Sequence, residues 1–186
     1  WGDTVVIKAG FGAAGAGRSF DLQAAADGVS WQTIATVVTD AQGNASFSYR
    51  PATNLYYRGA FAGAPDLAAV TSPPARVVVR QIALLRPTAN GGTRIVSRGR
   101  KVTFTTTVRP ARADLPPASV TLAIYRRVGG RWAPFTTRTV YVNAAGQASY
   151  TWTFSARGEW YVRSIANPTL ANANSAWSPV ERYSVR

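Results

Sequence analysis

The sequence predicts an all-β protein made of two β-sandwich domains in tandem. Three observations lead to this prediction: short apolar–polar alternations, turn-forming residues between them, and a second half that repeats the first. About seven short strands fit into each half of about 100 residues, which is typical of a sandwich of the immunoglobulin type. No stretch has a convincing helical pattern, and residues 64–70 are expected to form a loop or one turn. We therefore expect helix in less than about a tenth of the chain.

A period of two residues identifies the strands. In the first of them, Val5, Ile7 and Ala9 alternate with the residues at positions 4, 6 and 8. A strand with this period turns one of its faces towards a core. The residues expected to face inward are Val5, Ile7, Phe20, Leu22, Phe47 and Tyr49 in the first domain, and Val102, Phe104, Leu122, Ile124, Tyr150 and Trp152 in the second.

One turn occurs twice in the chain. "TDAQGNASFSYRP" (39–51) can be laid on "VNAAGQASYTWTF" (142–154), which places Gly43 on Gly146 and Phe47 on Tyr150. Four further pairs of segments keep the same order: 2–7 with 99–104, 20–31 with 120–132, 54–61 with 158–165, and 76–80 with 182–186. Two homologous domains, 1–81 and 82–186, account for this order.

The two repeats differ at their beginnings. The second has "IALLRPTANGGTRIVSR" (82–98) before its "GRKVTF", whereas the first has only Trp1 before its "GDTVVI". The first domain is therefore expected to lack its N-terminal strand in this chain. Either the polypeptide is longer, or another molecule supplies the strand at the sheet edge. We favour a longer polypeptide over donation between copies.

Several kinds of chemistry are excluded by composition. The chain has no Cys and no His, which removes thiol nucleophiles, disulfides, histidine bases and zinc sites of the usual kind. The eight acidic residues are scattered, and Asp27 and Asp40 sit in turns, where a carboxylate commonly bonds the backbone. The glycine-rich residues 10–17 lack the Lys-Ser/Thr of a phosphate loop. We expect no enzyme, no metal and no cofactor.

The positive charge is concentrated in the second domain. Residues 1–81 hold six basic and five acidic residues, for a net charge of +1, whereas residues 82–186 hold fifteen and three, for +12. Such a field attracts an anionic partner, although a solvated basic surface or a charged sheet edge would have the same composition. The candidate contacts are Arg94, Arg98, Arg100, Arg126, Arg131 and Arg138. Arg126 and Arg127 should point to opposite faces, so only one can join an outward patch with Arg131 and Arg138.

The aromatic residues suggest two different roles. Trp31, Trp132, Tyr57 and Tyr161 occupy corresponding places in the two repeats, and we expect them to pack in the cores. Trp177 lies in the polar stretch "NANSAWSP" and has no aromatic counterpart near Thr71. It is the candidate for an exposed aromatic side chain that stacks on sugar rings.

The order of motifs in the first repeat resembles a known group of domains. Trp31 is followed by "TDAQGNASFSYRP", then by "YYR" (56–58) and "TSP…VVV" (71–79). This order resembles the immunoglobulin-like or fibronectin-III-like tandem repeats of exported proteins from GC-rich bacteria. The second repeat departs from it, because Asn143 replaces the turn Asp and "GEWYVR" splits the "YR" pair. The resemblance implies an extracellular or cell-surface location and a spacer, adhesive or filament-forming role.

Three functions remain open. The first is a non-catalytic extracellular structural or adhesive module of a longer exported protein or surface filament, with other copies or other domains as partners. The second is a binding module for an anionic glycan or cell-wall polymer through the basic second domain. Nucleic-acid binding is the third and is not favoured, since no known motif for it is present. No apolar run approaches the roughly 20 residues of a membrane helix, so no membrane insertion is expected.

Overall fold

The computed structural model describes residues 1–87, 92–111 and 118–186. Its regular structure is all β apart from one three-residue 3-10 helix, η1 (Ala13–Gly15), which confirms the predicted fold class. Residues 64–67 form a tight turn in which the amides of Ala64 and Leu67 each donate to the other's carbonyl. None of the described residues belongs to a helix that is long and apolar enough to cross a membrane. The chain divides into two compact units, Trp1–Val79 and Arg80–Arg186.

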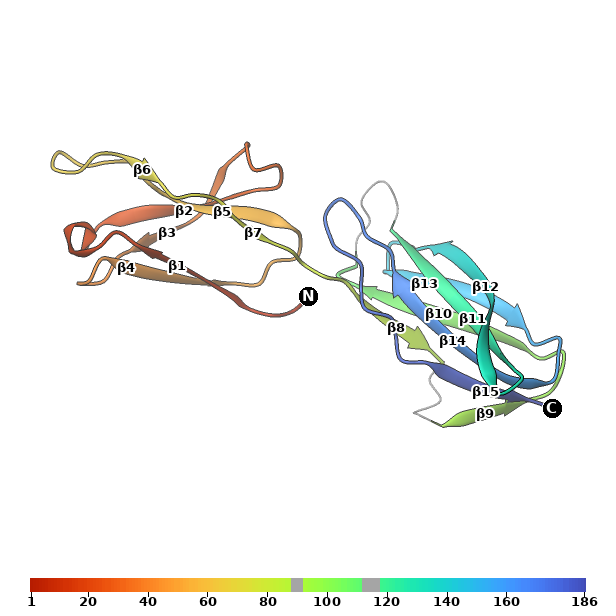
Figure 1. Cartoon of the computed structure of the whole chain (residues 1–186). Helices are drawn as coiled ribbons and strands as arrows, with labels where there is room; N and C mark the ends of the chain where they lie inside the picture. Colours follow the sequence, from red (N-terminus) through yellow and green to blue (C-terminus); the bar gives the residue numbers. More distant parts are fainter. Residues whose placement is uncertain (88–91, 112–117) are drawn as a thin grey trace. The chain divides into compact units, whose positions relative to one another are not determined.

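The first unit has one small and one larger antiparallel sheet. Its strands are β1 (Val5–Gly10), β2 (Ser19–Ala25), β3 (Gln32–Val38), β4 (Asn44–Tyr49), β5 (Leu55–Phe61), β6 (Val70–Thr71) and β7 (Ala75–Val77). β1 and β4 form the small sheet, and the other has the order β3-β2-β5-β6, with β7 also paired to β5 (Figure 1). Between the sheets, the ring centroids of Phe11 and Phe20 lie 5.3 Å apart, and those of Tyr49 and Tyr57 lie 6.1 Å apart.

Among the described residues, the second unit repeats this plan with two additional strands, β8 (Ile82–Arg86) and β9 (Thr93–Val96), and with no strand that corresponds to β6. Its other strands are β10 (Lys101–Arg109), β11 (Ser119–Val128), β12 (Arg131–Tyr141), β13 (Gln147–Thr153), β14 (Gly158–Ala166) and β15 (Glu181–Val185). Its sheets have the orders β13-β10-β8 and β12-β11-β14-β15-β9. β8 pairs antiparallel with β10, and β9 pairs parallel with β15. Among the described residues, neither β8 nor β9 has a counterpart in the first unit.

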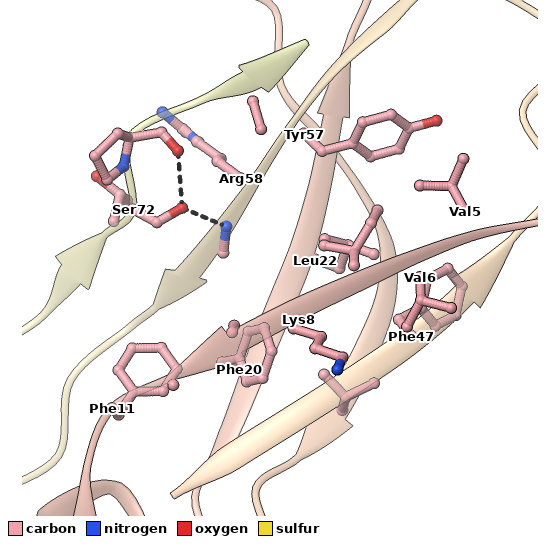
Figure 2. Close-up of a pocket in the computed structure, with 18 of the residues that line it drawn as sticks. Val5, Val6, Lys8, Phe11, Phe20, Leu22, Phe47, Tyr57, Arg58 and Ser72 are labelled. Atoms are coloured by element: carbon pink, nitrogen blue, oxygen red, sulfur yellow. Dashed lines mark hydrogen bonds between the residues drawn. The ribbon is translucent and has the colours of Figure 1, made fainter. Parts of the chain in front are cut away.

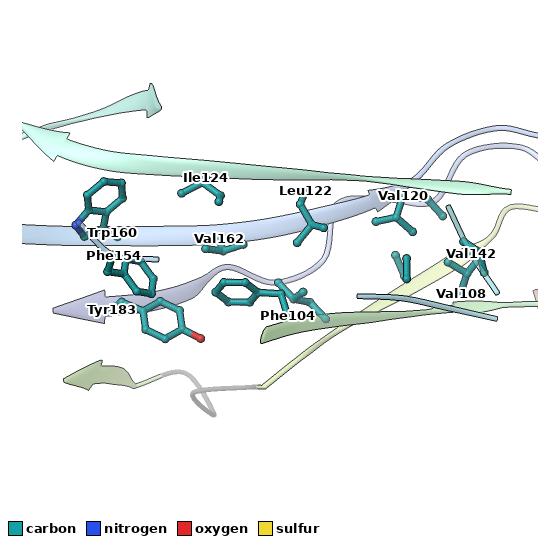
Figure 3. Close-up of a cluster of buried hydrophobic side chains, with 14 of the residues drawn as sticks. Phe104, Val108, Val120, Leu122, Ile124, Val142, Phe154, Trp160, Val162 and Tyr183 are labelled. Atoms are coloured by element: carbon teal, nitrogen blue, oxygen red, sulfur yellow. The ribbon is translucent and has the colours of Figure 1, made fainter. Parts of the chain in front are cut away.

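The cores lie between the sheets, as the alternation predicts. In the second unit Phe104, Leu122 and Ile124 are fully buried (Figure 3). Val102, Tyr150 and Trp152 are half-buried and pack against the same core cluster. In the first unit Phe20 and Leu22 are buried, but the other four predicted inward residues are only half-buried: Val5, Ile7, Phe47 and Tyr49. The core-facing side of the β1–β4 sheet is thus less buried than that of the equivalent β13-β10-β8 sheet in the second unit.

The recurring turn has the same geometry in both units. The amide of Asp40 donates to the carbonyl of Asn44 at 2.7 Å, and that of Asn143 donates to Gln147 at 2.8 Å. In each case the side-chain oxygen of the first residue accepts two backbone amides, at 2.8–2.9 Å for Asp40 and 2.9–3.0 Å for Asn143. Asn143 therefore replaces Asp40 without loss of the turn. The glycine of the turn has a positive φ in both units, 77° at Gly43 and 78° at Gly146.

Two buried tyrosines make stability sensitive to alkaline pH. Burial raises the pKa of Tyr57 and of Tyr183 from 10.0 to about 12. Because folding raises the pKa, the stabilisation is complete below about pH 10 and should be lost as pH rises towards 12. We expect Tyr183→Phe to remove this loss in the second unit and Tyr57→Phe in the first, measured by urea unfolding between pH 9 and 12. An unchanged pH profile in both variants would contradict the assignment.

Candidate ligand-binding surface

A row of stacked aromatic rings lies on the outer face of the five-stranded sheet of the second unit. Tyr125 on β11 pairs in register with Tyr161 on β14, and their rings stack at 4.4 Å and 17°. Trp132 on β12 meets Tyr161 edge to face at 4.8 Å. Tyr125 and Tyr161 share this face because they are direct cross-strand neighbours and both point away from the core. Their mutual packing holds the rings in fixed orientations.

Arg163 extends the row towards the loop after β14. Its guanidinium donates to the hydroxyl of Tyr125 at 3.0 Å and lies 5.2 Å from that ring's centroid. The same guanidinium lies 4.2 Å from the ring of Trp177. The resulting series, Trp132–Tyr161–Tyr125–Arg163–Trp177, is named the aromatic ladder below. Trp132 is 38% exposed and Trp177 is 39% exposed, so both ends of the ladder face solvent.

Two serines hold Trp177 in place. The Ser175 hydroxyl accepts the amide of Ala166 at 2.9 Å, and the Ser178 hydroxyl accepts the amide of Ser164 at 3.0 Å. Backbone bonds run in the opposite direction, from Ser175 to Ala166 and from Ser178 to Ser164. Since Trp177 lies between these two anchors, its ring is presented on a segment that is tied to β14.

Charged groups border the ladder. Arg127 donates to Glu159 at 2.7 Å beside Trp132, and both side chains are about half exposed. A hollow of about 290 Å³ lies between this pair and Arg182. Loss of solvation raises the pKa of Tyr161, the neighbouring phenol of Tyr125 adds to the rise, and Arg163 opposes it. The hydroxyl of Tyr161, like any neutral phenol, can donate a hydrogen bond.

The predicted arginine contacts do not form one patch with this ladder. Arg94, Arg98 and Arg100 lie on or just after β9, whereas Arg131 and Arg138 lie on β12. β9 and β12 are the opposite edges of the five-stranded sheet, about 19 Å apart at the usual strand spacing. The two groups therefore lie on separate parts of the sheet, and their contact with an anionic partner stays a prediction.

Several of these arginines are engaged within the unit. Arg126 lies over the buried ring of Trp160 at 5.4 Å and donates to the carbonyl of Arg157 at 2.9 Å. It is therefore the member of the 126/127 pair at the rim of the core, and Arg127 is the outward one. Arg98 donates to the carbonyl of Ser155 at 2.9 Å, and Arg138 donates to the hydroxyl of Tyr150 at 3.3 Å.

The expectation that four aromatic residues pack in the cores is correct only for Tyr57, which is 3% exposed. Tyr57 pairs with Ala24, and Val162 pairs with the equivalent Ile124. Val162 is therefore the counterpart of Tyr57, so the repeat alignment was wrong by one residue here. Three of the residues lie on or near outer sheet faces: Tyr161 and Trp132 in the ladder, and Trp31 under the guanidinium of Arg58 at 4.2 Å.

The acidic residues serve local structure. Asp27 accepts the amides of Val29 and Ser30 and the Ser30 hydroxyl, and these bonds lower its pKa from 3.8 to about 2. Asp21 accepts the Thr36 hydroxyl at 2.7 Å, and Asp66 pairs with Arg18. Among the described residues, no three His, Cys, Asp or Glu side chains converge as metal ligands. Asp114 lies outside the described residues.

Fold and surface together define a tandem immunoglobulin-like β-sandwich protein with one aromatic sheet face. No family matches the sequence, and no curated protein matches it. The solved D0-D1 domain of intimin is 13% identical, with a TM-score of 0.32, over 98% of this chain and 91% of that one. Alpha-2-macroglobulins are similar over 98% of this chain but 14% of theirs: the trypsin-activated Escherichia coli protein (10% identity, TM-score 0.41) and a Salmonella mutant (10%, 0.42).

Proposed function

We propose that this chain is a non-catalytic structural or adhesive module that acts outside the cell, as part of a longer exported protein or a surface assembly. The observation that carries this proposal is the use of its carboxylates. Five of them are engaged by turn amides, hydroxyls or arginines: Asp21, Asp27, Asp40, Asp66 and Glu159. Glycosidase chemistry needs two carboxylates that face each other across a cleft. These residues instead hold the strands and turns of the sandwiches.

The location can be tested on intact cells that produce the protein. Antibodies raised against the 186-residue chain should label unpermeabilised cells, and brief protease treatment of those cells should remove the label. A cytosolic protein should keep its signal under the same treatment, as the control. Labelling that needs permeabilisation would contradict a surface module.

A second candidate function is the binding of an anionic glycan or wall polymer. The aromatic ladder favours it, because flat rings at fixed positions can stack on sugar rings while Arg163 and Arg182 supply positive charge. The net charge of +12 in residues 82–186 would add attraction at longer range. On this proposal the aromatic ladder makes the direct contact with the polymer. The arginines at the two sheet edges provide the positive electrostatic potential that attracts it.

Removal of the ladder's exposed end should weaken such binding. Trp177→Ala and Arg163→Ala should each lower the affinity for an anionic polysaccharide by about fivefold to tenfold, which corresponds to about 1–1.4 kcal/mol. Affinity electrophoresis or calorimetry with the full chain measures this. Retention should also fall as salt shortens the screening length below about 8 Å.

Tyr141→Ala is the matched control, since Tyr141 is 69% exposed on the same unit and lies outside the ladder. It should bind like the parent chain. If Trp177→Ala binds as well as this control, the ladder is not the binding surface. If binding persists unchanged at high salt, the positive charge does not contribute.

A further inference from the structure

The edge of β1 that faces away from β4 is an open sheet edge. In the part of the chain that the structure describes, β1 pairs only with β4. The amide of Phe11 donates to Gly43 on the β4 side at 2.9 Å, so the odd-numbered residues of β1 bond towards β4. The backbone groups of Val6, Lys8 and Gly10 therefore point to the open side. Such an edge is a template for another strand.

The second unit fills the equivalent place with β8. Since Val102 corresponds to Val5, the stretch of β10 that pairs with β8, Thr105–Arg109, corresponds to residues 8–12. Ala83 and Leu85 of β8 point inward opposite Val108 and Thr106 and are 5% and 4% exposed. One short strand therefore completes both the sheet and the core of the second unit.

The residues beneath β8 are more buried than their counterparts in the first unit, which has no such strand among the described residues. In the second unit three core-facing residues of β10 are at most 2% exposed: Phe104, Thr106 and Val108. Their counterparts in the first unit are only half-buried: Ile7, Ala9 and Phe11. The apolar pattern is thus present in both units, but only one of them buries it.

A groove of about 680 Å³ runs along this part of the first unit (Figure 2). Its walls are β1 and the segment from Val70 to Val77, and Phe20 and Leu22 form its floor. Tyr57, a residue that is 3% exposed, lines the same groove, and its buried hydroxyl has no hydrogen-bond partner among the described residues. An apolar groove beside unpaired backbone suits an extended peptide, which satisfies both.

We propose that this groove binds one β-strand of the β8 type, supplied by a polypeptide segment outside residues 1–186, antiparallel to β1 at residues 8–12. The strand would place a small side chain opposite Phe11 and a larger one opposite Ala9. This order of sizes matches the alanine and leucine of β8. Its alternate residues would pair their backbone with Lys8 and Gly10.

The chain's own strands are poor occupants. The β8 of a second copy would have to leave its own sandwich, where Ala83 and Leu85 are buried. Two copies that paired β1 with β1 would bring their Lys8 side chains onto the same new sheet, and such a charge disfavours edge-to-edge association. A separate strand that is apolar on one face meets neither obstacle.

The test uses the full chain and a synthetic peptide with the sequence of residues 81–86, both free and joined to Trp1 by a flexible Gly-Ser linker. The linker supplies a millimolar effective concentration if the free peptide binds weakly. We expect hydrogen exchange of the Lys8 and Gly10 amides to slow at least tenfold at saturation, and the unfolding midpoint of the first unit to rise. A linked chain without this protection overturns the proposal.

Two control peptides separate strand pairing from simple apolar adhesion. In one, the amide at the position of Leu84 is N-methylated, which removes one backbone hydrogen bond between the peptide and β1 and leaves every side chain in place. In the other, the apolar residues are moved by one position, which turns them to solvent. Both should give less than a third of the protection. Equal protection by either control, or protection that grows with chain concentration without any peptide, would overturn the proposal.

Discussion

Trp160→Ala should lower the free energy of unfolding of the second unit by about 3–5 kcal/mol, the usual cost of removing a large aromatic residue from a core. Trp160 is fully buried, and its indole N–H donates to the carbonyl of Ala156 at 3.1 Å. Its ring contacts Phe135 at 5.0 Å and Phe154 at 5.7 Å. Its removal therefore leaves a cavity and an unpaired carbonyl together. Urea unfolding, followed by NMR signals of the second unit, gives the value.

Trp177→Ala is the control for this experiment, because it makes the same chemical change at a residue that is 39% exposed. It loses one cation–π contact with Arg163 and should cost at most about 1 kcal/mol. Similar losses in the two variants would show that the second unit is not centred on Trp160.

Gly43→Ala should destabilise the first unit by about 2–5 kcal/mol. A methyl group there would lie 1.8 Å from the carbonyl oxygen of Gly12, a backbone atom that cannot move aside by rotating. The left-handed backbone, at φ 77°, adds about 1–2 kcal/mol for any residue with a Cβ, and overpacking adds about 1–3 kcal/mol. Thermal unfolding of the first unit measures the sum.

Gly28→Ala separates the two contributions. Gly28 has nearly the same φ, 75°, but a methyl group there would meet the ring of Tyr56 at an ordinary 3.6 Å. It should therefore cost only the 1–2 kcal/mol of backbone strain. If Gly43→Ala costs no more than Gly28→Ala, the close approach to Gly12 is not what selects glycine in this turn.

The inward pattern and the recurring turn could be predicted because both depend on neighbours in the sequence. Phe104 and Leu122 face the core through simple alternation, and the Asp40 and Asn143 turns depend on residues no more than four positions away. The half-burial of Ile7 could not be predicted from its own strand. It depends on whether another strand covers it.

The aromatic ladder could not be predicted because it depends on which strands are neighbours. Tyr125 and Tyr161 are 36 positions apart and meet only because β11 pairs with β14. A one-residue error in aligning the repeats was enough to assign Tyr161 to the core. The sequence of β14 did contain a sign of this, since Tyr161 and Arg163 alternate with Trp160 and Val162, which are buried. This alternation indicates that Tyr161 and Arg163 share the outer face of the sheet. The sheet order likewise separates the arginines of β9 from those of β12, and their contact with an anionic partner stays a prediction.

The parallel pairing of β9 with β15 has a mechanical consequence. Tension applied through Arg80 would first load β8, which pairs with β10. Once β8 is released, tension between β9 and Arg186 would draw β9 and β15 past each other along their length. Their bonds, together with those from Arg98 to Arg186 and from Arg186 to Val96, would then be loaded in shear and would have to break together. An antiparallel terminal pair would instead open one bond at a time. We therefore expect the parallel β9–β15 pair to resist stretching along the chain.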